Sequence, residues 1–126
     1  MKRVGYLHEK VYAEDNIELA DDKARRNKSI RCGIKQHDKN RLKENKELSD
    51  KLRDLIYQTS EYSTFIIYEP KERLIFRLPY YPDRITHHAI MNIMEPIWTN
   101  IFIDQTYSSI RNRGIHKVEH DLFKVL

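Results

Sequence analysis

The stretch YSTFIIYEPKERLIFRLPYYP, residues 62–82, decides the fold expected of this chain. Two runs rich in aromatic and β-branched residues flank Glu69-Pro70-Lys71-Glu72, which is the pattern of a β-hairpin. The two-residue period of a strand divides the second run into two faces. One face holds Arg73, Ile75 and Arg77, and the other holds Leu74, Phe76 and Leu78. We expect the second face to pack and the first to present guanidinium groups.

After the hairpin, apolar residues recur every four positions at Ile85, Ala89, Ile93 and Ile97. This spacing predicts a helix that packs against the sheet. Asp83 is of a type that caps helices, and Pro96 predicts that the helix stops or kinks near Glu95.

Apolar residues at helical spacing also occur before and after the hairpin. This spacing predicts helices within residues 12–27 and 40–58 and near the end of the chain, whereas residues 28–37 show no clear period. The apolar stripes are Ile17, Ala20 and Ala24; Leu48, Leu52, Leu55 and Ile56; and Val118, Leu122 and Val125. A Glu47–Lys51 pair is expected on the charged face of the second helix. The fold class is therefore α+β, with residues 1–61 as a basic helical segment and 62–126 as the hairpin, helix and loop, together one compact unit.

The composition is that of a polar chain. Charged residues make up 33% of the 126 residues and apolar ones 40%, and no apolar run approaches the ~20 residues of a membrane span. The single cysteine, Cys32, excludes an intrachain disulfide, and no secretory signal pattern begins the sequence. We expect a chain that stays in solution in a reducing, cytoplasmic compartment.

Positive charge is concentrated locally. Residues 23–41 contain eight Lys or Arg against one acid, Asp38, although the whole chain carries only +4. Such a cluster is typical of a phosphate-binding surface, and equally of a solvated polar segment. The candidate nucleic-acid contacts here are Arg25, Arg26, Lys28, Arg31 and Lys35.

The hairpin adds Lys71, Arg73 and Arg77. Arginine offers a rigid fork of donors that matches phosphate oxygens, and lysine supplies a point charge. These residues could clamp a triphosphate or a nucleic-acid backbone; the alternative is a solvated strand face paired with Glu69 or Glu72. Arg84, beside Asp83, is a weaker candidate.

A second candidate anion contact is Arg111-Asn112-Arg113-Gly114. Gly114 can take positive φ and Asn112 tolerates it, so that backbone N–H groups could face an anion. A tight turn with two exposed arginines is the alternative.

We assign no catalytic or metal-ligating residue. His87 and His88 diverge around a helix, and His116 and His120 lack an evident third ligand. Asp21 and Asp22 lie in a helical pattern, unlike the paired aspartates of a two-metal polymerase site, and are interpreted as helix surface.

An ordered series of motifs runs through residues 64–122. It comprises Tyr68-Glu69-Pro70-Lys71-Glu72-Arg73, Ile75, Pro79, Asp83-Arg84, His87-His88-Ala89, Asn92-Ile93, Glu95-Pro96-Ile97, Phe102-Ile103, Thr106-Tyr107-Ser108 and Arg111-Asn112-Arg113-Gly114-Ile115-His116. The series resembles the fingers region of bacterial reverse transcriptases of the group II intron and diversity-generating retroelement type. Ala24-Arg25-Arg26-Asn27-Lys28 is similar, more loosely, to their basic leading segment. The chain departs from the family at Gln105 and Thr106, where Asp-Ser is usual, and at Asn112, where glycine is usual.

The resemblance implies the fingers part of a right-hand polymerase. Arg73, helped by Lys71 and Arg77, would contact the triphosphate of the incoming dNTP, and Asp83-Arg84 would support the hairpin and follow the RNA template. The partners implied are an RNA template, a DNA primer and the palm and thumb of the same polymerase. The palm carboxylates and the Tyr-x-Asp-Asp hairpin, which would bind Mg²⁺ in the full-length enzyme, are not in the sequence. We therefore expect the leading part of a reverse transcriptase, without a cofactor and inactive by itself.

Two other functions remain open. The chain could be a stand-alone RNA- or single-stranded-DNA-binding module that uses the basic clusters. It could also be an interaction domain that self-associates through its apolar end, Phe123, Val125 and Leu126.

Overall fold

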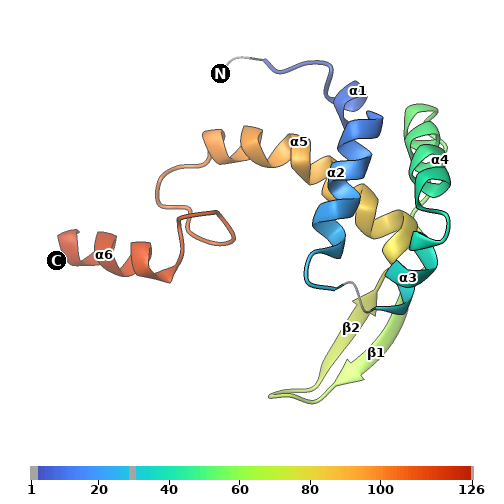
Figure 1. Ribbon diagram of the computed structural model, residues 1–126. Helices are drawn as coiled ribbons and strands as arrows, with labels where there is room; N and C mark the ends of the chain where they lie inside the picture. Colours follow the sequence, from blue (N-terminus) through green and yellow to red (C-terminus); the bar gives the residue numbers. More distant parts are fainter. Residues whose placement is uncertain (1–2, 29–30, 126) are drawn as a thin grey trace. The chain divides into compact units, whose positions relative to one another are not determined.

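The computed structural model describes residues 3–28 and 31–125, and it has the α+β fold expected from the sequence. In these residues, six α-helices accompany one two-stranded antiparallel sheet (Figure 1). The chain divides into two compact units, Met1–Ile93 and Met94–Leu126, and the boundary predicted after residue 61 lies inside the first.

The elements follow one another in a simple order. They are α1 (Leu7–Tyr12), α2 (Glu14–Arg25), α3 (Cys32–Asp38), α4 (Arg41–Arg53), β1 (Ser63–Ile67), β2 (Arg73–Arg77), the short helical turn η1 (Tyr80–Arg84), α5 (Ile85–Ile101) and α6 (Ile115–Val125). The helices predicted within 12–27 and 40–58, the hairpin and the last helix are confirmed. Helix α3, in the segment without a period, was not predicted.

The core of the first unit is formed by helices alone. Its buried apolar residues come from α2, α4 and the start of α5: Ile17, Ala20, Leu48, Leu52, Ile85 and Ala89. Because the apolar stripe of α5 meets α2 and α4, the prediction that this helix packs against the sheet is wrong.

Helix α4 ends at Arg53, three residues before the end of its predicted stripe at Ile56. Leu55 has a φ of 57°, and the N–H of Ile56 donates to the carbonyl of Lys51 at 3.1 Å. This left-handed C-terminal motif turns the chain away from the core. Leu48 and Leu52 are buried as predicted, but Leu55 and Ile56 are exposed. The predicted Glu47–Lys51 ion pair is present at 2.6 Å.

Within the first unit, the hairpin extends beyond α2, α3 and α4 (Figure 1). Ser63 pairs with Arg77 and Ile67 with Arg73, so the predicted alternation along β2 is correct. The predicted packing is not, because Leu74 is 54% and Phe76 61% exposed. A two-stranded ribbon with no layer over it leaves both of its faces open to solvent.

Two predictions about α5 also need correction. Asp83 does not cap the helix; its carboxylate accepts hydrogen bonds from the Tyr57 hydroxyl at 2.6 Å and the Ser60 N–H at 3.0 Å, and it is buried. The predicted stop near Glu95 is wrong, because the helix continues through Pro96 to Ile101, while the alternative, a kink at this position, stays a prediction. Proline removes a single helical N–H, and the hydrogen bonds on either side remain possible.

The second unit contains α6 and the turn before it. Asn112 has the positive φ that was predicted, 63°, whereas Gly114 does not. Asp121 on α6 accepts hydrogen bonds from Lys117 at 2.8 Å and Tyr107 at 2.9 Å, which lower its pKa to about 2.

The apolar end of the chain is exposed, as predicted, at Phe123 and Val125, while Leu126 lies outside the described residues. Among the helices of the described ranges, none combines the length and apolar character that crossing a membrane requires.

Candidate nucleic-acid interface

Four cationic side chains from separate parts of the first unit line one small pocket. They are Lys28, Arg31, Arg77 and Arg84, and we call this site the basic pocket. Its volume is about 40 Å³, and Gly33, Ile34, Leu78 and Tyr80 complete its lining. The fold thus brings together cations that are up to 56 residues apart in sequence.

Local structure explains how each cation reaches the pocket. Lys28 and Arg31 belong to the turn after α2, where the Arg31 N–H donates to the Lys28 carbonyl at 3.0 Å. Arg77 is the last residue of β2, at the end of the hairpin that joins the helices, and Arg84 is the last residue of η1.

Gly33 lets α3 approach η1 closely at this point. A Cβ on Gly33 would lie 3.2 Å from the Cβ of Tyr80, which is tighter than nearly all contacts of this kind. The absence of a side chain at Gly33 therefore helps to hold the two segments that line the pocket together.

The charges of the basic pocket are not neutralised. In residues 3–28 and 31–125, none of its four cations forms an ion pair, whereas Arg25, Arg41 and Arg113 all pair with aspartates. An anion would therefore gain contacts here without having to displace a carboxylate.

The neighbouring histidine is sensitive to this positive charge. Burial lowers the pKa of His88 on α5, and the charges of Lys28 and Arg84 lower it further. The charges of Lys28 and Arg84 thus act in the same direction as burial, against protonation of His88.

A larger, more open pocket adjoins the first. It has a volume of about 440 Å³ and shares Arg31, Arg77, Leu78 and Arg84 with the basic pocket. Cys32, Phe65, Ile75 and Phe76 form the rest of its lining. Exposed aromatic rings beside unpaired arginines are the combination that holds the bases and phosphates of single-stranded nucleic acids.

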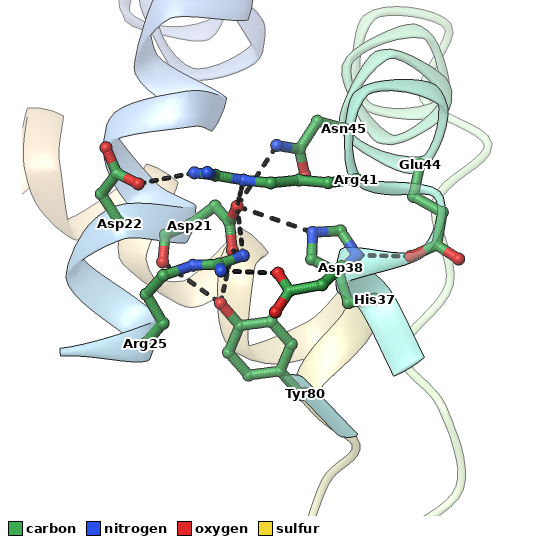
Figure 2. A network of polar contacts seen from close by, with 9 residues as sticks. All are labelled: Asp21, Asp22, Arg25, His37, Asp38, Arg41, Glu44, Asn45 and Tyr80. Carbon is green, nitrogen blue, oxygen red and sulfur yellow. Dashed lines mark hydrogen bonds and ion pairs between the residues drawn. The ribbon is translucent and has the colours of Figure 1, made fainter. Parts of the chain in front are cut away.

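A buried polar network centred on Asp21 shares Tyr80 with the lining of the basic pocket (Figure 2). The Asp21 side chain is 0% exposed and accepts two hydrogen bonds of 2.9 Å from Arg25, in addition to hydrogen bonds from Arg41 and Tyr80. The interpretation of Asp21 as helix surface is wrong, although Asp22 is exposed. Because Asp21 binds groups from α4 and η1, it ties together the elements that support the pocket.

His37 of α3 is the other buried member of this network. Its Nδ1 is hydrogen-bonded to Glu44, its Nε2 lies 3.6 Å from a carboxylate oxygen of Asp21, and its ring stacks on Tyr81 at 5.3 Å. Burial lowers the pKa of His37, but the nearby carboxylates of Asp21 and Glu44 outweigh this effect and raise the pKa above its usual value. Burial acts to raise the pKa of Asp21, and its polar contacts, with His37 and Tyr80 foremost, bring the pKa well below the usual range.

The other residues predicted from the hairpin lie elsewhere. Lys71 and Arg73 are exposed near its far end and do not line the basic pocket. Arg73 and Arg77 are four residues apart on one strand, or roughly 13 Å. The three hairpin cations therefore do not form one cluster. In the described residues neither Glu69 nor Glu72 pairs with Lys71 or Arg73, so the expected alternative of a salt-bridged face is not seen either.

The remaining candidates divide into engaged and exposed residues. Arg25 is bound to Asp21 and Asp38, and Arg113 donates to the Ile103 carbonyl and to Asp104. Their guanidinium groups therefore have roles within the fold. The exposed candidates outside the pocket are Arg26, Lys35 and Arg111.

Sequence reasoning missed Gly33, Ile34 and Tyr80 as parts of the pocket, and it missed the burial of Asp21. One signal for Asp21 was present: with Ile17, Ala20 and Ala24 it completes an i, i+3, i+4, i+7 stripe, the spacing of a buried helix face.

Within residues 3–28 and 31–125, no group of three or more His, Cys, Asp or Glu side chains is placed to hold a metal ion. In comparisons with known proteins, neither a protein-family model nor a curated protein matches the sequence.

Proposed function

We propose that the first unit binds single-stranded nucleic acid at the basic pocket and the adjoining aromatic pocket, as the fingers portion of a reverse transcriptase. The observation that carries the proposal is the convergence of four unpaired cations, Lys28, Arg31, Arg77 and Arg84, on one site. The polymerase context rests on the ordered motif series, and Arg77 and Arg84 belong to the region that carries it.

The chemistry of the site favours this ligand class. Arginine forks bind phosphate oxygens two at a time, and Phe65, which pairs with Ile75 on the face of the hairpin that also carries Arg77, offers a ring to bases of any sequence. Hydrogen bonds to base edges are not needed for such binding. The site is therefore suited to a strand that must be held whatever its sequence, such as a template.

Substitution of single cations tests the proposal. Affinity for a fluorescein-labelled single-stranded RNA is measured by anisotropy for the wild type, Arg77→Ala, Arg84→Ala and the control Lys43→Ala. Lys43 is exposed on α4 and does not line the pocket. Each pocket variant should weaken binding about tenfold, the effect of one lost charge-assisted hydrogen bond, and the control should not. Equal affinities for all four proteins would refute the proposal.

The same experiment separates the pocket from a diffuse basic segment. Arg26 and Lys35 belong to the same cluster in the sequence but lie outside the pocket. If Arg26→Ala and Lys35→Ala weaken binding as much as Arg31→Ala, the affinity arises from local charge density and the pocket has no special role.

The resemblance supports a further role for the far end of the hairpin. Lys71 and Arg73 are exposed there and free of carboxylate partners in the described residues, as contacts to a dNTP triphosphate would require. The test is a fusion to the palm and thumb of a reverse transcriptase of the same type, with dNTP incorporation measured on an RNA template. Arg73→Ala should raise KM for dNTP or lower kcat. If both are unchanged, Arg73 does not contact the nucleotide.

A further inference from the structure

The size of the basic pocket limits what can enter it. A bound water molecule needs about 10–15 Å³ of cavity volume, so the volume of about 40 Å³ accommodates roughly three oxygen-sized atoms. That number matches the free oxygens of one terminal phosphate group. The larger adjoining pocket, with a volume of about 440 Å³, offers the room that a nucleobase needs.

The charge of the pocket exceeds what an internal phosphate needs. A phosphodiester in a strand carries one negative charge, whereas a phosphate monoester carries about −1.5 to −2 at pH 7 and has three strong acceptor oxygens. The pocket offers four cations, and no acidic residue is among its lining residues. Three of the four are arginines, each able to bind two oxygens of one phosphate.

The uncharged lining residues of the pocket strengthen the attraction between its cations and a phosphate. Ile34 is buried, Leu78 is half-buried, and the Tyr80 hydroxyl donates to Asp21 rather than to the pocket. Apolar surface near the cations lowers the local dielectric constant and increases the attraction for a doubly charged group over a singly charged one.

We propose that the basic pocket binds a terminal phosphate monoester of a nucleic-acid strand in preference to an internal phosphodiester, with the adjacent nucleoside lying against Phe65 and Ile75 in the adjoining pocket. The inference rests on the proposed nucleic-acid binding and deepens it. The two pockets share Arg31, Arg77 and Arg84, so a terminal phosphate in one leaves its own nucleoside next to the other.

Four single-stranded RNAs of one sequence test the inference: one with a 5′-phosphate, one with a 3′-phosphate, one with hydroxyls at both ends, and the hydroxyl form made two nucleotides longer. The two additional internal phosphates of the longer form add a charge of about −2, at least as much as the roughly −1.5 to −2 of a terminal phosphate. We expect one of the phosphorylated forms to bind about tenfold more tightly than both hydroxyl forms, as one additional charge-assisted hydrogen bond would give. Which end is preferred identifies the polarity of the bound strand.

Two variants show whether the preference arises in the pocket. Arg77→Lys keeps the charge but loses the fork, so it should reduce the preference for the phosphorylated end while it retains affinity for the hydroxyl form. Lys43→Ala should leave both unchanged. A circular dichroism spectrum identical to that of the wild type establishes that Arg77→Lys is folded.

The outcomes distinguish this inference from the proposed function. If all four oligonucleotides bind equally, with affinity that falls as salt is added, the nucleic-acid proposal stands and the terminal-phosphate inference is wrong. If none binds, both are wrong. A preference that persists in Arg77→Lys would place the terminal phosphate outside the basic pocket and would also refute the inference.

Discussion

Replacing Asp21 by asparagine should destabilise the first unit strongly. The Asp21 side chain is fully buried and is hydrogen-bonded to Arg25, Arg41 and Tyr80. Asparagine keeps the shape but removes the charge, and leaves two partly buried guanidinium groups facing a neutral amide. Removal of one partner from a buried ion pair costs about 3–5 kcal/mol.

The structure places the expected cost at the lower end of that range. Arg25 retains Asp38 at 2.6 Å and Arg41 retains Asp22 at 2.5 Å, so neither cation is left without a carboxylate. We expect a loss of about 3 kcal/mol, out of the roughly 5–15 kcal/mol typical of a folded domain. For a unit of this size the melting temperature should fall by about 12–24 °C.

The neighbouring aspartate provides a matched control. Asp22 is one residue away, is exposed, and binds only Arg41, so Asp22→Asn should cost less than about 1 kcal/mol. The assay is urea denaturation of both variants and the wild type, followed by circular dichroism at 222 nm and compared through the transition midpoints. If Asp21→Asn and Asp22→Asn differ by less than about 1 kcal/mol, the network does not hold the helices together and our reasoning about it is wrong.

Three further predictions concern single residues. Because folding raises the pKa of His37, the protonated side chain stabilises the protein below pH 6.5, and this contribution is lost as pH rises through the folded-state pKa. The urea midpoint should therefore be higher at pH 6 than at pH 9. A His37→Gln variant whose urea midpoint differs between pH 6 and pH 9 as much as that of the wild type would contradict this. Leu55→Gly should stabilise the protein by about 0.5–1 kcal/mol, since Leu55 is exposed and holds a φ of 57° that glycine adopts without strain; a lower urea midpoint would refute the assignment. Binding of a phosphorylated oligonucleotide should raise the pKa of His88, because the anion offsets Lys28 and Arg84; an NMR titration in which His88 is unaffected at saturation would place the ligand elsewhere.

The elements with a clear local period were predictable. Alternation in residues 62–82 identified the hairpin, and the spacing of Leu48 and Leu52 identified α4. The end of α4 was not predictable from its stripe, since Leu55 adopts a conformation that glycine usually takes at that position. Pro96 was given too much weight, because the loss of one N–H does not end a helix whose other hydrogen bonds persist.

Local sequence patterns could not predict which distant elements pack against one another. The stripe of α5 identified a buried face but not its partner, and the helices α2 and α4 cover it instead of the two-stranded sheet. Asp21 was predicted to be exposed because it is a charged residue, and the sequence does not show which residues it binds. Its partners Arg41 and Tyr80 lie 20 and 59 residues away along the chain.

The candidate site was predicted as a set of cations but not as a geometry. Lys28, Arg31, Arg77 and Arg84 were all named from the sequence, and the fold brings these four together. It separates Arg73 from Arg77 along the strand and uses Arg25 within the core network. Which cations converge depends on how the turn after α2 meets the base of the hairpin, and no local pattern encodes that arrangement.

The most direct test of the central claim is the salt dependence of single-stranded RNA binding. Each phosphate that the protein neutralises contributes a slope of about −0.7 to log K against log salt concentration, so the phosphate held in the basic pocket predicts a slope of at least that magnitude. The double variant Arg31→Ala/Arg77→Ala should reduce the magnitude of the slope by about 0.7, while Lys43→Ala leaves it unchanged. A wild-type slope near zero, or a double variant with the wild-type slope, would contradict the claim that the basic pocket binds nucleic acid.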